Sequence, residues 1–149
     1  MNRFFQRLII AACLIVSNFV VAQNNITYVY EDNTGNNGKV EWTRTMEIPD
    51  AEIGLPKKVF LPVKNISTEP LKILQAKSHC GCTDAQAPSE PIAPGATGYI
   101  EITYTAKPRY ENESKMTPPP FTFYQIVDVT TNFDTKNAIV LSVQGTVVK

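Results

Sequence analysis

The sequence predicts an all-β fold, an immunoglobulin-like sandwich of two sheets with about seven strands. From residue 26 onward, apolar residues alternate with polar ones at a period of two, and no apolar stripe at helical spacing extends over ten or more residues. The alternating runs are short and are bounded by Gly, Pro, Asn and Asp. The chain has 149 residues, 43% of them hydrophobic and 11 of them proline, which suits strands and turns in a globular protein. About seven runs at this spacing are typical of a two-sheet sandwich.

The first 22 residues have the three parts of a secretory signal peptide. Arg3 and Arg7 supply positive charge, residues 8–21 are apolar apart from a Ser-Asn pair, and Ala22 offers a small residue for cleavage before Gln23. A retained membrane anchor is the alternative, but the apolar run of roughly 14 residues is shorter than the ~20 needed to span a bilayer. We therefore expect a signal peptide at 1–22, a single domain at 23–149, and no stable membrane span after cleavage.

Lipidation is a second alternative for the N-terminal segment. The residues Ile10-Ala11-Ala12-Cys13 resemble a lipobox, in which Cys13 would become the acylated N-terminus. Only residues 8–12 would then form the apolar core before cleavage, and residues 14–22 would make an unusually apolar tether. Either route predicts export to the periplasm, to the outer envelope or out of the cell.

The charge of the mature chain argues against nucleic acid as a partner. The whole chain is neutral, with 14 basic and 14 acidic residues, and loss of the two arginines of the signal segment leaves a net charge of −2. No basic tract occurs anywhere in the sequence. Because affinity for nucleic acid depends on clustered Lys and Arg, we expect partners to be proteins of the cell envelope.

The N-terminal half of the domain predicts three strands in order. Residues 26–30 and 40–46 flank a run of turn formers at 31–38 and are interpreted as a hairpin. Residues 58–64 place three apolar side chains on one face, and Pro62 on the other face indicates an edge or bulged strand because proline cannot donate to the ladder.

The remaining elements follow from the same signals. Residues 65–70 form a turn, 71–77 a strand, and 88–98 a connecting loop that its prolines keep from being helical. Residues 99–105 alternate, with Ile100, Ile102 and Tyr104 directed inward. Three consecutive prolines make 107–120 an exposed excursion without regular pairing. Strands at 121–130 and 138–148 are joined by a turn at 131–134, and six aromatic residues are assigned to the core: Tyr28, Tyr30, Trp42, Phe121, Phe123 and Tyr124.

Several motifs between Val59 and Val147 resemble a known family. They are Asn65 followed by Pro70-Leu71, the run Ser78-His79-Cys80-Gly81-Cys82-Thr83, the loop Pro91-Ile92-Ala93-Pro94-Gly95, and the closing Leu141-Ser142-Val143-Gln144-Gly145-Thr146-Val147. This set resembles the bacterial domain of unknown function DUF1573, common in Bacteroidota and similar to the immunoglobulin-like major sperm protein and ASH-type sandwiches. The resemblance implies a fold and a compartment, and it carries no activity. We expect Asn65, Gly81, Pro94 and Gly95 to have structural roles in turns.

Cys80 and Cys82 are the two cysteines of the mature chain, and export would place them in an oxidising environment. In a regular strand these positions share a face about 6.6 Å apart, which is too far for a bond. Either a disulfide or a shared metal therefore requires Gly81 to turn the chain sharply, which a glycine at positive φ permits. Geometry leaves the bond and the metal both open.

His79, the only histidine, adjoins the pair and could add a third soft ligand for Cu(I) or Zn(II). If the strand continues through the motif, however, His79 points away from both cysteines, and the mature chain offers no further His or Cys as a fourth ligand. A redox pair would lack the Cys-x-x-Cys spacing on a helix N-terminus. We expect a structural corner without a cofactor, in which Ser78 or Thr83 satisfies turn amides.

No catalytic arrangement emerges from the remaining residues, so we expect no enzyme. A nucleophilic triad would have to use His79, which has no orienting carboxylate nearby in sequence, and Glu111 and Glu113 lie in the exposed excursion. The favoured hypothesis is a non-enzymatic binding or scaffold module of the cell envelope that acts through the Cys loop, 88–98 or 107–120, or by adding a partner strand to a free sheet edge. The alternative is a metal-binding or thiol-redox protein centred on the His-Cys-Gly-Cys motif.

Overall fold

The computed structural model describes residues 27–29, 34–35 and 38–149, with side chains from residue 38 onward. The expected signal peptide, its cleavage site at Ala22 and Gln23, and Cys13 lie outside the described residues. The side chains of Tyr28 and Tyr30 lie outside them as well. Among the described residues, none forms a helix of the length and apolarity that crossing a membrane would need.

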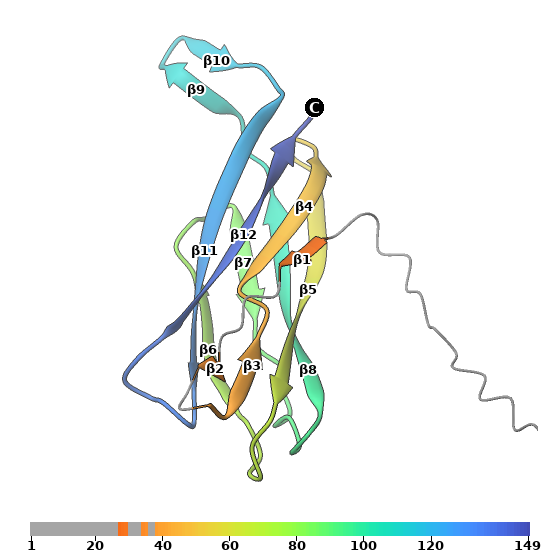
Figure 1. Ribbon diagram of the computed structural model, residues 1–149. Coiled ribbons are helices and arrows are strands. Elements are labelled where there is room, and N and C mark those ends of the chain that lie inside the picture. Colours follow the sequence, from red (N-terminus) through yellow and green to blue (C-terminus); the bar gives the residue numbers. More distant parts are fainter. Residues whose placement is uncertain (1–26, 30–33, 36–37) are drawn as a thin grey trace, which may run out of the picture.

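The described residues form two five-stranded sheets that face each other, and a separate two-stranded hairpin (Figure 1). The first sheet has the order β1 (Thr27–Val29), β4 (Thr45–Ala51), β12 (Ile139–Val147), β11 (Phe121–Thr131) and β6 (Ile73–Ser78). The second has the order β2 (Thr34–Gly35), β3 (Val40–Trp42), β5 (Pro56–Asn65), β8 (Thr97–Thr105) and β7 (Thr83–Gln86). The hairpin consists of β9 (Arg109–Asn112) and β10 (Lys115–Thr117). The predicted all-β sandwich is confirmed, with more strands than the seven expected.

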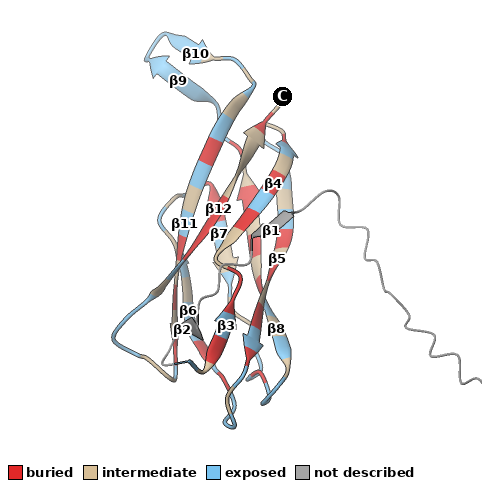
Figure 2. Ribbon diagram, in the orientation of Figure 1, coloured by how far each residue is buried: buried red, intermediate tan, exposed pale blue. Residues whose placement is uncertain are grey.

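The core lies between the two sheets, and in β3, β4, β5 and β8 the buried positions alternate with more exposed ones (Figure 2). Ile100, Ile102 and Tyr104 of β8 are all buried, as their spacing predicts. The Tyr104 ring stacks on Phe123 of β11, with ring centroids 3.9 Å apart, and so joins the two sheets. Burial raises the pKa of the Tyr104 phenol, because the charged form would lose its hydration.

The predicted N-terminal hairpin is confirmed in part: β1 pairs antiparallel with residues 45–47, but the predicted second strand is divided between the two sheets. Residues 40–46 are two strands, since the chain leaves the second sheet after Trp42, crosses at residues 43–44, and enters the first sheet as β4. β1 pairs with β4, whereas β3 pairs with β5 and β2. Of the loop at 31–38, residues 31–33 and 36–37 lie outside the described residues. Trp42 and Met46 are both buried, so the apolar pattern runs through the crossing and hides the change of sheet.

The expectation that Pro62 marks an edge strand is confirmed for part of β5. β3 pairs only with residues 63–65 of that strand, so Pro62 lies where one side of β5 has no partner strand within the described part of the chain. The other side pairs with β8 along the whole length of β5. A proline is tolerated here because no ladder hydrogen bond is lost.

Two further expectations need correction. Residues 107–120 are exposed as predicted, but β9 and β10 pair with each other, because the three prolines come after the hairpin and leave its amides intact. Tyr124 is 59% exposed on the outer face of β11, while Trp42 and Phe123 are buried as expected. The residue next to a buried Phe123 must point outward in a strand of period two.

Candidate functional site

The Cys-Gly-Cys motif forms the corner at which the chain passes from one sheet to the other. β6 ends at Ser78 in the first sheet, and β7 begins at Thr83 at the edge of the second. Cys80 and Cys82 are joined by a disulfide, with their Cα atoms 5.2 Å apart. The amide of Thr83 donates to the carbonyl of Cys80 at 3.1 Å, and the amide of Thr105 in β8 donates to the carbonyl of Cys82 at 2.8 Å. These backbone bonds close the turn and fasten it to the second sheet.

Side chains complete the hydrogen bonds of the corner. The Ser78 hydroxyl accepts from the Cys80 amide at 3.2 Å and lies 3.3 Å from the Cys80 carbonyl oxygen, to which it donates. The Cys82 amide points at the sulfur of Cys80, 3.1 Å away. The Thr83 hydroxyl lies 3.7 Å from the Cys82 sulfur. Ser78 thus satisfies a turn amide, one of the two roles that the sequence suggests.

Gly81 does not use the left-handed conformation expected of it. Among the glycines of residues 38–149, only Gly38, Gly54 and Gly95 have positive φ. A Cβ built on Gly81 would meet nothing closer than the Lys107 ammonium nitrogen, at 3.5 Å, which is ordinary van der Waals contact. The sharp turn therefore forms in a backbone conformation open to other residues, and the predicted role of positive φ at Gly81 is wrong.

The disulfide closes a ring of only three residues. In the chain-entropy description such a loop contributes about 1.6 kcal/mol to the free energy of unfolding, against about 3 kcal/mol for a loop of 15 residues. Several hydrogen bonds hold the same corner without the sulfurs. The bond is thus a small part of what keeps β6 and β7 in place.

His79 faces the neighbouring strand rather than the sulfurs. Its Nε2 atom lies 2.7 Å from Oδ2 of Asp128 in β11, and both side chains are partly exposed. A carboxylate does therefore orient His79, although none is near it in sequence. Within the described ranges, no group of three or more His, Cys, Asp and Glu side chains is arranged to hold a metal ion.

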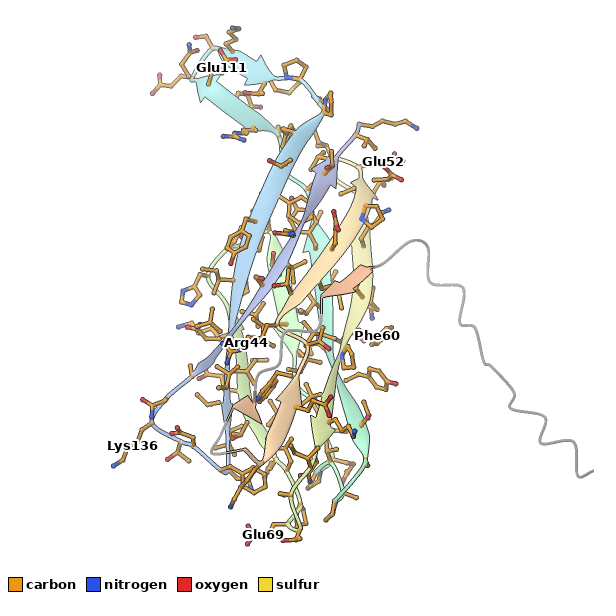
Figure 3. All side chains as sticks on the ribbon, in the orientation of Figure 1. Arg44, Glu52, Phe60, Glu69, Glu111 and Lys136 are labelled. Atoms are coloured by element: carbon orange, nitrogen blue, oxygen red, sulfur yellow. A yellow bond between two sulfur atoms is a disulfide. The ribbon has the colours of Figure 1, made fainter. Side chains whose placement is uncertain are left out.

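The turn at Asn65 and the 88–98 loop meet at the opposite end of the sandwich, where Figure 3 labels Glu69. Asn65 is fully buried, and its Nδ2 donates to the carbonyls of Glu69 and Ile92 at 2.8 and 2.9 Å. Its Oδ1 accepts from the amide of Ser67 at 3.0 Å and from its hydroxyl at 2.7 Å. One side chain thus ties the turn to the loop.

The Pro94-Gly95 step completes this end of the molecule. Gly95 has a φ of +76°, which only glycine adopts without strain, and its amide donates to the Asn65 carbonyl at 2.8 Å. Asn65, Pro94 and Gly95 therefore lie together in one hydrogen-bonded unit. These three residues therefore have the structural role in turns that is expected from the sequence.

The structure brings together two of the three surfaces proposed from sequence. The cysteine corner is bonded to Thr105, and Lys107, where the 107–120 excursion begins, lies beside Gly81. The 88–98 loop is at the far end of β8. A contact surface could therefore include the corner and the excursion, but not the loop.

The β9–β10 hairpin carries an exposed apolar pair that sequence patterning missed. Tyr110 and Met116 lie directly opposite each other, with 59% and 47% of their surface exposed. Glu111, labelled in Figure 3, is paired with Lys115 at 2.7 Å. Figure 2 shows the hairpin projecting beyond the sandwich, and all its strand residues are exposed except Thr117, which is half-buried. The sequence does contain a sign of this pair, since Tyr110 and Met116 are two large apolar residues in a polar, proline-rich segment.

Comparisons with known proteins agree with this architecture. A protein of unknown function from Porphyromonas gingivalis W83 is similar at 11% identity and a TM-score of 0.56, over 72% of this chain and 46% of that chain, so this chain spans less than half of its length. The ASH/PapD-like domain 7 of human CEP192 is similar at 12% identity and a TM-score of 0.53, over 83% of this chain and 94% of that one. The secreted serine protease VesC from Vibrio cholerae is similar at 10% identity and a TM-score of 0.51, over 79% and 25%. Such low identities show the fold alone.

No curated protein matches the sequence. The family of proteins of unknown function DUF1573 matches residues 39–147, which run from the start of β3 to the end of β12 and include the cysteine corner and the Asn65 turn. The match covers most of the chain and begins well before Val59, where the resemblance of the motifs starts. The chain therefore belongs to the DUF1573 family.

Proposed function

We propose that this protein is a non-enzymatic binding module of the bacterial cell envelope, exported by removal of residues 1–22, that contacts a protein partner through its β9–β10 hairpin. The observation that carries the proposal is the exposed pair of Tyr110 and Met116 on a hairpin that takes no part in either sheet. The family match and the similar sandwiches support a module of this size and shape.

The composition of the hairpin favours a protein partner. Aromatic residues, Met and Arg are enriched at protein interfaces, and Arg109, Tyr110 and Met116 are all exposed within this short segment. The ion pair between Lys115 and Glu111 leaves little net charge to attract nucleic acid or an anionic surface. The paired backbone of β9 and β10 holds Tyr110 and Met116 on one side of the hairpin in the absence of a partner, which reduces the entropy cost of binding.

Addition of a partner strand to a sheet edge is the second route considered from sequence. The edges formed by β6 and β7 are six and four residues long, and the exposed Lys77 in β6 and Asp84 in β7 place charges on them. Short, charged edges disfavour pairing with another chain. The hairpin is therefore a better candidate surface than these two edges.

Site-specific photocrosslinking tests the proposal. A photoreactive aromatic residue replaces Tyr110 in the full-length chain, expressed in an exporting host, and a control chain carries it at Lys136, an exposed position distant from the hairpin (Figure 3). We expect a discrete adduct from position 110 only. Excess purified wild-type protein should compete it away, and protein with Tyr110→Ser and Met116→Ser should not. Equal adducts from both positions, or equal competition by both proteins, would contradict the proposal.

A further inference from the structure

The two cysteines of the corner differ in burial. Cys82 is packed in the core with 9% of its surface exposed, whereas Cys80 is only partly buried. An incoming thiolate should therefore attack at Cys80, the more exposed of the two cysteines. In thiol–disulfide exchange, the sulfur that is attacked depends on such access.

The surroundings of Cys80 favour negative charge on its sulfur. The amide of Cys82 points at this sulfur from 3.1 Å. The ammonium group of Lys107 lies beside the corner, 3.5 Å from the position that a Cβ on Gly81 would take, and no described carboxylate forms an ion pair with it. Amide donors and nearby cations are the features that stabilise a thiolate.

Several hydrogen bonds of the corner do not depend on the disulfide. The hydrogen bonds of Thr83 and Thr105 to the two cysteine carbonyls, and that of the Cys80 amide to Ser78, involve no sulfur. A disulfide that closes a three-residue ring adds little to the free energy of unfolding. By thermodynamic linkage, the folded structure stabilises the disulfide against reduction by the same small free energy. The equilibrium constant for reduction should thus differ by no more than about fifteen-fold between the folded and unfolded chains.

From these three features we infer an activity beyond the proposed binding function: the Cys80–Cys82 disulfide exchanges with the dithiol of another protein, and Cys80 forms the mixed disulfide. A partner thiolate attacks the Cys80 sulfur, the intramolecular S–S bond breaks, and its electron pair leaves on Cys82 beside the Thr83 hydroxyl. The partner's second thiolate then attacks its own sulfur in the mixed disulfide and releases Cys80 as a thiolate. The partner dithiol is oxidised to a disulfide, and this chain is reduced by the same two electrons to two thiols.

Single-cysteine variants of the mature protein test which sulfur reacts. Cys82→Ser leaves Cys80 as a free thiol, and Cys80→Ser leaves Cys82. With oxidised glutathione as the probe, we expect the Cys80 thiol to react at least about tenfold faster than the Cys82 thiol. Adding Lys107→Gln to Cys82→Ser should slow the reaction several-fold, while Lys136→Gln, with the same change of charge far from the corner, should not. Equal rates for the two thiols, or equal effects of the two lysine substitutions, would overturn the inference.

An equilibrium measurement on the unsubstituted protein covers the case in which a variant does not fold. The oxidised protein is equilibrated with glutathione redox buffers in native conditions and in guanidinium chloride, and the free thiols are counted by alkylation and mass. We expect midpoints whose equilibrium constants agree within about fifteen-fold, together with an unchanged far-UV spectrum of the reduced native protein. If the equilibrium constant for reduction is orders of magnitude smaller in the native protein than in the unfolded chain, the disulfide is a protected structural bond and the exchange activity is refuted.

Discussion

Replacement of Asn65 by alanine should destabilise the domain more than the same replacement of any other Asn or Gln in the described part of the chain. Asn65 is fully buried, and its side chain makes four hydrogen bonds that join the 65–70 turn to the 88–98 loop. Without Asn65, the Ile92 carbonyl keeps the Leu71 amide as a donor, and the single proton of the Ser67 hydroxyl, no longer drawn to Oδ1, is available to the Glu69 carbonyl. The penalty is therefore the loss of four bonds and a small cavity, without an orphaned acceptor.

The magnitude follows from these contacts. At roughly 1 kcal/mol net for each bond, reduced because three of them are only partly buried, Asn65→Ala should cost about 3 kcal/mol of the free energy of unfolding. For about 110 ordered residues, an unfolding entropy of roughly 2.1 cal/mol/K per residue converts this loss into a fall in Tm of about 13 °C. Asn65→Asp should cost more, because a buried carboxylate would face the carbonyls of Glu69 and Ile92.

Urea denaturation and calorimetry of the mature protein measure these changes, and Asn132→Ala is the matched control. Asn132 also bridges two segments, accepting from the Lys72 amide at 2.8 Å and donating to the Pro70 carbonyl at 3.1 Å, but it is exposed. Its loss should cost less than about 1 kcal/mol. If the two alanine variants lose equal stability, or if Asn65→Asp is more stable than Asn65→Ala at pH 7, the assigned role of Asn65 is wrong.

Two glycine substitutions and two titrations give further predictions. Gly145→Ala would place a Cβ on a backbone carbonyl of β4, so we expect a loss of about 2–3 kcal/mol in urea denaturation; a neutral result would contradict the close strand packing. Gly81→Ala should leave Tm within about 2 °C, since its φ is not positive and the added Cβ has room; a large fall would restore the requirement for glycine. Hydrogen bonds from the side chain and backbone of Asn137 hold the pKa of Asp134 below its ordinary value, so its stabilisation is complete above pH ~3.9 and is lost as pH falls through the lower folded value. An NMR titration that finds an ordinary pKa would refute this. Burial raises the pKa of Tyr104, so stability should fall as pH rises above ~10, and an ultraviolet titration should show this phenol ionising after the exposed ones; simultaneous ionisation would contradict it.

Periodicity in the sequence predicts which face of a strand is buried, and it succeeds where strands are long. The inward residues of β8 follow directly from alternation, because burial there repeats every second residue. In β12, Leu141, Val143 and Val147 are buried as alternation predicts, but Ser142 is buried as well. The same pattern does not identify the partner of a strand. The crossing between β3 and β4 keeps Trp42 and Met46 buried in different sheets, so alternation alone could not separate one strand from two.

The candidate site was predictable in its residues and less so in its geometry. The motif identifies Cys80 and Cys82, but their bond depends on a turn that Gly81 makes without positive φ, one of several conformations open to glycine. The partner of His79 could not be found, since Asp128 is 49 residues away and is brought close only by the pairing of β6 with β11. Long-range register of this kind is not encoded in local spacing.

Intact-mass spectrometry of the protein purified from an exporting host tests the proposed export and the oxidised corner together. The sample is alkylated under denaturing conditions, with and without prior reduction. We predict a chain that begins at Gln23, takes up no alkyl group before reduction and takes up two afterwards, on Cys80 and Cys82. A chain that retains residues 1–22, or one that is alkylated twice without reductant, would contradict an exported domain with a joined cysteine pair at its corner.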